Sequence, residues 1–358
     1  MYRVAILNNY PFEEVWREVE RREKPDHHLY GINYFHHRGY NVEIVHFQNS
    51  QLLQSINQFL YRAQFPVPLG DIDQQWSSLQ LLNDADLIYA PCQTQTHILN
   101  YIKALGLIKI PIVSLAHHPL ARGRLSWLRS PFMKLWVRGN DALPSLSQAV
   151  ADEINSILPL RSSVTNWGPD ANFYPELGRL GKGVVAAGRT GRDFITFGLA
   201  ASQTNIRSHI ICLQNSVSNT FKTFAKNVQI TVQPQNNFMK YPELLEIYAN
   251  ARVLAIPMVS GFSLSGLTSL MDALGMGKPV IMTRNPFIDI DIEAEGIGKW
   301  VSPGDIEGWK NAIQFFEDNE DKALEMGQRA RALVDAGLNS EKFAHQIMDI
   351  FDKIIQKK

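Results

Sequence analysis

Short apolar runs, separated by longer segments with helical periodicity, fill the first half of the chain. The runs lie at 2–7, 41–47, 86–90, 110–116 and 141–146. Segments 29–38 and 148–158 have the apolar spacing of helices. This alternation predicts a parallel sheet whose strands are connected by crossover helices.

The same alternation restarts after 166–183, a segment rich in Gly, Pro and Asn that is typical of an interdomain linker. The later apolar runs lie at 183–188, 208–213, 228–232, 252–257 and 279–283, with helical patterns at 194–203, 242–250, 268–274 and 340–358. We therefore expect an α/β protein of two doubly wound domains. Ligands would bind at the carboxyl ends of the strands and in the cleft between the domains.

Composition narrows the class of protein. A length of 358 residues corresponds to two domains, and a formal net charge of +0 argues against a nucleic-acid partner. Cys92 and Cys212 lie in apolar surroundings and predict buried free thiols in a reducing compartment. The first apolar run is too short for a signal peptide, and no run approaches the ~18 apolar residues of a membrane span. We expect a cytoplasmic globular protein.

The segment 260–283, "SGFSLSGLTSLMDALGMGKPVIMT", places small residues directly before an amphipathic helix and a buried strand. Ser265 is the predicted N-cap of the helix, and Gly275 and Gly277 suit its end. Such a loop lets backbone N–H groups approach an anion, most often a phosphate, at the positive end of a helix. The alternative is a packing loop that binds nothing.

Neighbouring segments extend this signal, among them "KYPELLEIYANARVLAIP" at 240–257, "VVAAGRTGRDF" at 184–194 and "GIGKWVSPGDIEGWKNAI" at 296–313. In their order and spacing they resemble GT-B glycosyltransferases, most nearly glycosyltransferase family 4 (glycosyl transferases group 1). The segments 139–154, 164–175 and 326–334 extend the resemblance, which is best from 140 to about 335.

The resemblance implies a GT-B fold, in which two Rossmann-like domains face a cleft. The acceptor-side domain would span 1–168 and be completed by 340–358, the C-terminal helix crossing back to it, and the donor-binding domain would span 172–339. The implied activity is metal-independent, retaining transfer of a sugar from a nucleotide-diphosphate sugar to an acceptor hydroxyl, with no cofactor. A lipid-linked acceptor or a role in polysaccharide biosynthesis would fit.

The resemblance also implies roles for a basic turn after the strand at 183–188. Arg189 matches a family position that grips the donor diphosphate, and Gly188 precedes it. The second basic position of the family falls on Phe194, so Arg192 would take its place. The alternative for both arginines is an ordinary solvated surface position.

The loop before the helix would complete the donor site. The implied donor-binding residues are Ser263, Leu264, Ser265, Gly266, Leu267, Thr268 and Asp272. Asp272 matches a glutamate that accepts hydrogen bonds from ribose hydroxyls, its alternative being a solvated helix carboxylate. Leu264 stands where the family has another glutamate, which helps to hold the donor sugar, so this departure bears on sugar identity and on activity.

Histidines mark the N-terminal half. His117 follows the run at 110–116 and matches a family histidine near the donor sugar, with His118 beside it. A histidine that merely caps the loop is the alternative. His27 and His28 are candidates for an acceptor-side base, and ordinary surface positions are their alternative.

The segment 121–141 interleaves basic and aromatic residues, and such a segment can lie on an anionic membrane surface. This predicts peripheral contact through 121–138 at the inner face of the membrane. The alternative is a core helix with snorkelling basic side chains.

Two "DID" sequences, at 71–73 and 289–291, do not follow a strand pattern that would place a metal beside a nucleotide, so no metal site is expected. The chain has no Walker A or GxGxxG sequence, which argues against kinases and dehydrogenases. Two functions remain besides transfer: a GT-B-fold nucleotide-sugar epimerase and a non-catalytic nucleotide-sugar-binding protein.

Overall fold

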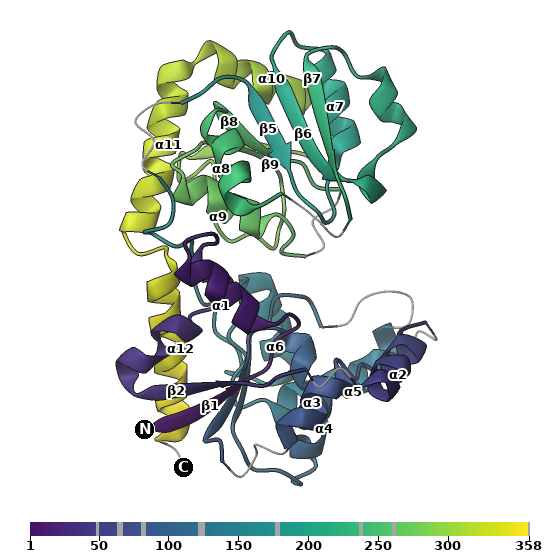
Figure 1. The fold of residues 1–358 in the computed structure, drawn as a ribbon, viewed down its shortest axis with the longest axis vertical. Coiled ribbons are helices and arrows are strands. Elements are labelled where there is room, and N and C mark those ends of the chain that lie inside the picture. The colour runs from purple at the N-terminus through teal and green to yellow at the C-terminus, as the bar shows by residue number, and fades with distance from the viewer. Residues whose placement is uncertain are drawn as a thin grey trace. The chain divides into compact units, whose positions relative to one another are not determined.

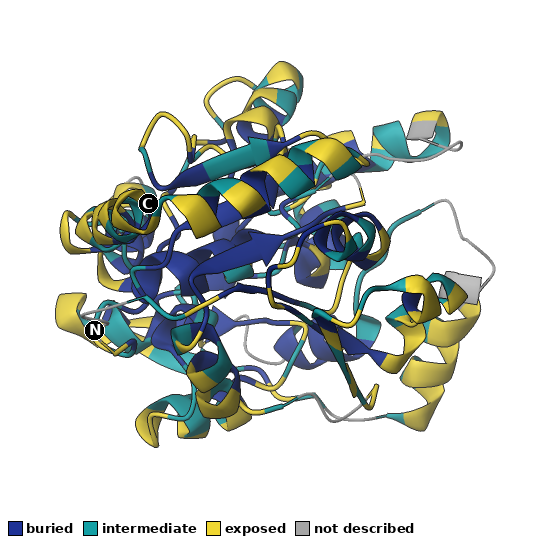
Figure 2. Ribbon diagram, turned by 90° about the horizontal axis from the view of Figure 1, so that it is seen from above, coloured by how far each residue is buried: buried dark blue, intermediate teal, exposed yellow. Residues whose placement is uncertain are grey.

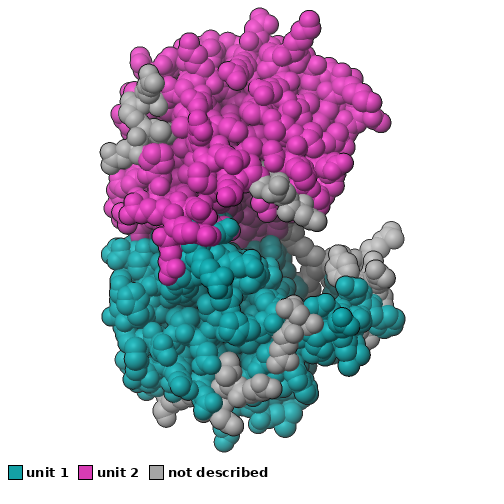
Figure 3. Space-filling view, viewed as in Figure 1, with its two compact units in different colours: residues 1–18, 26–167, 340–358 teal, residues 19–25, 168–339 magenta. Residues whose placement is uncertain are grey.

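The computed structural model describes residues 1–47, 50–62, 67–79, 84–120, 126–175, 180–235, 239–259 and 263–356. The chain divides into two compact units, shown in Figures 1 and 3. The first unit comprises Met1–Glu18, Asp26–Trp167 and Ser340–Lys358, and the second comprises Val19–Pro25 and Gly168–Asn339.

A parallel sheet with strand order β2-β1-β3-β4 forms the centre of the described part of the first unit. Its strands are β1 (Tyr2–Ile6), β2 (Tyr40–Ile44), β3 (Leu87–Ala90) and β4 (Ile112–Ser114). The accompanying helices are α1 (Phe12–Glu20), α2 (Gln51–Arg62), α3 (Ile72–Ser78), α4 (His97–Ala104), α5 (Ser126–Gly139), α6 (Gln148–Ile157), α12 (Ser340–Ile355) and the 3₁₀ helices η1 (Asp26–Leu29), η2 (Ile32–Arg38) and η4 (Gln93–Thr96). β3 is buried throughout, as expected for a strand covered on both faces.

The described part of the second unit has a longer parallel sheet, with strand order β10-β9-β8-β5-β6-β7. Its strands are β5 (Val184–Ala187), β6 (Ser208–Leu213), β7 (Val228–Gln233), β8 (Val253–Ile256), β9 (Val280–Thr283) and β10 (Gly298–Val301). The helices are α7 (Phe194–Ser202), α8 (Tyr241–Ala249), α9 (Leu267–Gly275), α10 (Ile306–Asp318), α11 (Glu320–Asp335) and the 3₁₀ helices η5 (Gln214–Ser216) and η6 (Asn219–Thr223). Strand order reverses between the neighbours β5 and β8, so the carboxyl ends of these two strands form the topological switch point, where ligands bind in open α/β sheets.

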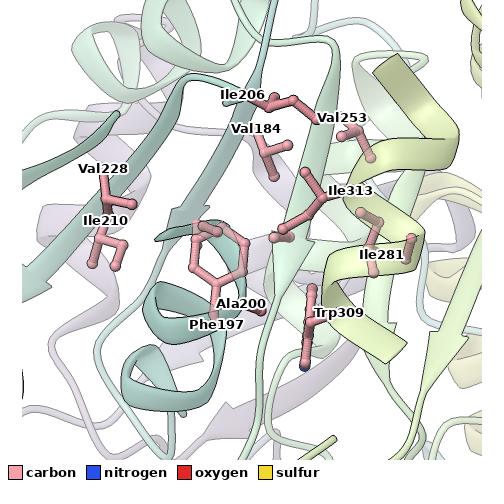
Figure 4. Packing of buried hydrophobic residues seen from close by; sticks show 14 of the residues in the cluster. Val184, Phe197, Ala200, Ile206, Ile210, Val228, Val253, Ile281, Trp309 and Ile313 are labelled. Atoms are coloured by element: carbon pink, nitrogen blue, oxygen red, sulfur yellow. The ribbon is translucent and has the colours of Figure 1, made fainter. Parts of the chain in front are cut away.

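An apolar layer between this sheet and two helices stabilises the second unit (Figure 4). Phe197 of α7 meets Trp309 of α10 edge to face, with ring centroids 5.5 Å apart. Ile281 of β9 and Val253 of β8 contribute from the sheet, and all four side chains are buried. In Figure 2 most of the strands are likewise buried, although β7 at the edge of the sheet is only partly buried, and the outer faces of the helices are exposed.

The C-terminal helix α12 belongs to the first unit, which confirms the predicted return of the chain. Phe351 of α12 packs edge-on against Phe35, Tyr40 and Tyr89, with ring centroids 5.2 to 5.4 Å apart. Arg38 of η2 donates a hydrogen bond to Asp352, 3.1 Å away. Aromatic burial and this ion pair hold the helix against η2, β2 and β3.

Two sequence predictions of secondary structure need correction, and one strand was not predicted. The run 141–146 forms only isolated bridges, to Val113, Ala116 and Val164, because Pro144 has no N–H group with which to continue a ladder. The predicted helix at 29–38 is replaced by η1 and η2, which are separated by Tyr30 and Gly31 with φ of 49° and 86°. β10 was not predicted, since Gly298 and Lys299 weaken the apolar signal of a strand with only four residues.

The two cysteines are free, as predicted. Cys212 is buried in β6, whereas Cys92 is partly exposed, so the expectation of burial was wrong for Cys92. No helix within the described ranges is long and apolar enough to cross a membrane.

Candidate functional site

The loops that follow β5 and β8 lie side by side at the switch point of the second unit. Met258, after β8, forms an antiparallel bridge with Arg192 in the loop after β5. The amide of Asp193 donates to the carbonyl of Pro257 at 3.0 Å, and that of Val259 donates to the carbonyl of Gly191 at 3.0 Å. These bonds fix the position of Arg192 at the carboxyl edge of the sheet.

The guanidinium of Arg192 is held beside the first turn of α9. Its Nη2 donates to the Ser269 hydroxyl at 2.8 Å, its Nη1 lies 2.8 Å from the Met258 sulfur, and its Nε donates to the Ala187 carbonyl at 3.3 Å. Gly188 leaves room for it, because a Cβ there would lie 2.3 Å from Nε. Burial lowers the pKa of Arg192 from its ordinary value, but an arginine side chain stays protonated in proteins. The site therefore contains a fixed positive charge.

The helix α9 starts one residue later than the sequence predicts. Its N-cap is Gly266, with φ of 94°, and not Ser265. The Ser265 hydroxyl instead pairs with that of Ser263 at 2.6 Å. Asn285, after β9, donates from Nδ2 to the carbonyl of Ser263 at 2.8 Å. The short loop 263–266 is thereby tied to the neighbouring strand end, while 260–262 lie outside the described residues.

The start of α9 can bind an anion. The first N–H groups of a helix have no partner within the helix, and the helix dipole places partial positive charge there. Leu267 already donates its amide to the carbonyl of Leu264, which leaves the following amides of the first turn, at Thr268 and Ser269, as the available donors. The Arg192 guanidinium adds a full charge beside the same turn, the arrangement that suits a phosphate or diphosphate.

Gly266 makes this loop geometry possible, which gives a first prediction. A Cβ at Gly266 would lie 2.9 Å from Met282 Cε and 3.0 Å from Ile256 Cγ2. We expect Gly266→Ala to lower the free energy of unfolding by about 1–3 kcal/mol in urea denaturation. Gly304→Ala is the matched control, since Gly304 has a φ of 72° and a Cβ there would have no atom within 4 Å. Equal losses in both variants would show that contact at Gly266 plays no part.

Asp272 is buried in α9 and is part of a tyrosine network. It exposes 3% of its surface, and its Oδ1 accepts hydrogen bonds from the hydroxyls of Tyr174 at 2.7 Å and Tyr241 at 3.1 Å. Burial raises the pKa of Asp272 to about 7, while the two tyrosines and Arg192 act in the opposite direction. The alternative of a solvated helix carboxylate is therefore wrong. A role toward a ribose stays a prediction.

The other residues predicted to bind the donor include both buried and exposed side chains. Leu264 and Leu267 are buried side chains, so only their backbone can face a ligand, and Thr268 is exposed. Arg189 is exposed, and its charge opposes the rise that burial causes in the pKa of Tyr241. Arg189 therefore lies near the tyrosine network.

His117 lies just beyond the carboxyl end of β4 in the first unit. Gln93 holds its loop, because the Gln93 Oε1 accepts hydrogen bonds from the amides of His117 and His118 at 2.7 and 2.8 Å. The imidazole Nε2 of His117 pairs with the carbonyl of Pro91. A carbonyl only accepts, so Nε2 carries the proton. Burial lowers the pKa of His117 to about 4, and the ring is therefore neutral near pH 7.

The other predicted histidines differ in exposure. His27 has no exposed surface and packs edge-on against Trp167, with ring centroids 5.0 Å apart, so the surface interpretation is wrong for His27. His28 is partly buried beside it, and His118 is exposed. An acceptor-side role for these three residues stays a prediction.

The two "DID" sequences have structural roles. Asp71 caps α3 by accepting from the amide of Gln74 at 3.0 Å. Asp291 accepts from the indole of Trp300 at 2.9 Å and from the amide of Glu293 at 3.1 Å. Within the ranges that the structure describes, no group of three or more His, Cys, Asp or Glu side chains could hold a metal ion.

Several residues at the switch point were not predicted from the sequence. Ser269 and Met258 hold Arg192, Asn285 holds the loop before α9, and Tyr174 and Tyr241 bind Asp272. The sequence could have indicated Ser269, since it lies in the first turn of a helix after a small-residue loop. No sequence pattern indicates the tyrosines, because they reach Asp272 only through the tertiary fold.

No protein-family model and no curated protein matches this sequence. Solved structures do. HepE from Anabaena, determined with UDP-glucose, is 16% identical, with 99% of this chain and 100% of that chain covered and a TM-score of 0.70. The chain has the GT-B fold. Sucrose-phosphate synthase from Thermosynechococcus elongatus is 11% identical over the full length of both chains, with a TM-score of 0.68.

The same fold also occurs in a different class of enzyme. UDP-GlcNAc 2-epimerase from Neisseria meningitidis, bound to UDP-GlcNAc, is 12% identical, with 99% of this chain and 100% of that chain covered and a TM-score of 0.57. The predicted GT-B architecture is thus confirmed, while membership of glycosyltransferase family 4 stays a prediction.

Proposed function

We propose that the chain is a glycosyltransferase that moves a sugar from a nucleotide-diphosphate sugar to an acceptor hydroxyl. The observation that carries this proposal is the Arg192 guanidinium, which is hydrogen-bonded to Ser269 in the first turn of α9 at the switch point. Solved structures of the same fold with UDP and UDP-glucose support a uridine nucleotide as the donor to test first.

The chemistry follows from where charge develops. When the bond between the anomeric carbon and the diphosphate oxygen breaks, negative charge builds on the leaving diphosphate. A guanidinium and helix amides already fixed at that position stabilise this charge without reorganisation. These groups supply the stabilisation from the protein itself, so we propose that transfer proceeds without a metal ion or other cofactor. The acceptor hydroxyl forms the new bond to the anomeric carbon, and its proton leaves with the diphosphate.

We further propose retention of configuration, with the acceptor attacking from the face that the diphosphate leaves. His117, neutral and held by Gln93 and Pro91, would hydrogen-bond a hydroxyl of the donor sugar. His27, His28 and His118 are proposed to serve the acceptor side. We also propose that the acceptor is lipid-linked or a polysaccharide and that the protein acts in the cytoplasm.

The test is product analysis with UDP-glucose and UDP-GlcNAc, in the presence of EDTA, with and without a panel of sugar and lipid-linked sugar acceptors. We expect release of UDP that depends on one acceptor class, with an anomeric configuration that matches the donor by NMR. Conversion of the donor to an isomer without UDP release would contradict transfer and favour the epimerase, whose fold this chain shares. Binding of the donor with no turnover under any acceptor would favour a non-catalytic binding protein.

A further inference from the structure

The helix α2 of the first unit turns apolar side chains outward. Leu52, Ile56 and Phe59 are 70%, 38% and 69% exposed, and their spacing places them on one face of the helix. The opposite side faces α3, where Asn57 Oδ1 accepts from the amide of Ile72 at 3.4 Å. A surface helix normally buries its apolar face against the core. This helix presents that face to the outside of the described chain.

The helix α5 lies at the same end of the first unit in Figure 1 and presents basic side chains. Lys134 and Arg138 are exposed, whereas Met133 and Trp136 of the same helix are buried in the core. Trp127, near the start of α5, is 70% exposed. The core-helix alternative therefore describes Met133 and Trp136, whereas Lys134 and Arg138 lie on the outside. Arg122 and Arg124 lie outside the described residues.

Two long stretches of sequence that include these helices contain no acidic residue. No Asp or Glu occurs at 44–70 or at 87–140, although the whole chain has 35 of each sign of charge. The same two stretches contain the basic residues Arg62, Lys103, Lys109, Arg122, Arg124, Arg129, Lys134 and Arg138. The charge of the chain is therefore balanced only overall, and the charged residues of these two stretches of sequence are all basic.

We propose that α2 and α5 together dock the first unit on a membrane surface that contains anionic lipid. Leu52, Ile56 and Phe59 would enter the boundary between headgroups and acyl chains, as the apolar face of an interfacial helix does. Exposed tryptophans such as Trp127 prefer this boundary, and Lys134 and Arg138 would meet the anionic headgroups. A second copy of the chain is a poorer occupant, since two such surfaces would bring like charges together.

The experiment is sedimentation of the full chain with vesicles of phosphatidylcholine alone or of phosphatidylcholine with phosphatidylglycerol. It is done without nucleotide sugar, so its outcome does not depend on the proposed function. We expect binding to the anionic vesicles, and we expect Leu52→Asn with Phe59→Asn to weaken partitioning at least about tenfold. The matched control is Leu160→Asn with Val217→Asn, because these residues are also exposed apolar side chains but belong to neither α2 nor α5.

Charge is tested separately with Lys134→Glu combined with Arg138→Glu, which should abolish the preference for anionic vesicles. Circular dichroism and thermal melting verify that each variant is folded. The proposal is overturned if the unmodified chain sediments with neither kind of vesicle. It is also overturned if the α2 variant and its control bind equally. An oligomer that dissociates in the α2 variant, without any vesicle binding, would assign the surface to a second copy and would also overturn it.

Discussion

Replacement of Arg192 with alanine is expected to weaken the binding of UDP to the full chain by about a hundredfold, since the charge-assisted hydrogen bonds of one guanidinium contribute about 1.5–3 kcal/mol. The guanidinium is already fixed by Ser269, Met258 and Ala187, so it loses little freedom when a diphosphate binds. Calorimetric titration in EDTA measures the effect. The loss should shrink as the salt concentration rises, because screening weakens the attraction in the unmodified protein.

Two further variants separate binding from folding. Arg192→Lys keeps the charge but loses the planar fork, and we expect intermediate affinity. Arg207→Ala removes an exposed arginine that directly precedes β6, at the opposite end of the sheet, and should leave affinity unchanged. Urea denaturation shows whether each variant is folded under the conditions of titration. Unchanged UDP affinity in a folded Arg192→Ala variant would contradict the site.

The second large effect concerns stability and pH at Asp272. Its pKa in the folded chain, about 7, exceeds the ordinary value of 3.8. The folded state therefore retains this proton where the unfolded state has lost it. The stability that this group contributes is fully present below pH 3.8 and is lost as the pH rises through about 7.

Asp272→Asn removes this titration while its amide oxygen can still accept from the hydroxyls of Tyr174 and Tyr241. The unfolding free energy of the variant minus that of the unmodified chain should rise by up to about 4 kcal/mol between about pH 4 and pH 7, and then stay level. Urea denaturation across this range measures it. Asp321→Asn, an exposed position in α11, is the control and should show no comparable rise. A flat difference for Asp272→Asn would mean that the buried carboxyl keeps its ordinary pKa.

Much of the fold can be predicted from the sequence because its strands are buried on both faces. Strands such as β5 and β8 read as continuous apolar runs, and the intervening helices have a clear period. The failures have local causes: Pro144 interrupts a ladder, and the backbone of Tyr30 and Gly31 interrupts a helix. The apolar stripe of α2 is visible in the sequence, but a stripe alone predicts burial, and only the structure shows that it faces outward.

The candidate site was less predictable. The position of Arg192 beside α9 follows from strand order, since β5 and β8 are neighbours although their sequences are far apart. The tyrosines of the Asp272 network lie 98 and 31 residues away from it in the chain, and no local pattern links them. The exact start of α9 depended on a hydrogen bond between Ser263 and Ser265, which removed the Ser265 hydroxyl from the cap.

We propose that the carboxyl edge of the second sheet binds a nucleoside diphosphate without a metal ion. The most direct test is calorimetric titration of the unmodified chain with UDP, GDP, ADP and dTDP, each in EDTA and in Mg²⁺. We expect saturable binding of one of these nucleotides, UDP first among them, with the same affinity in both buffers. Absence of binding by all four, or binding that requires Mg²⁺, would contradict it.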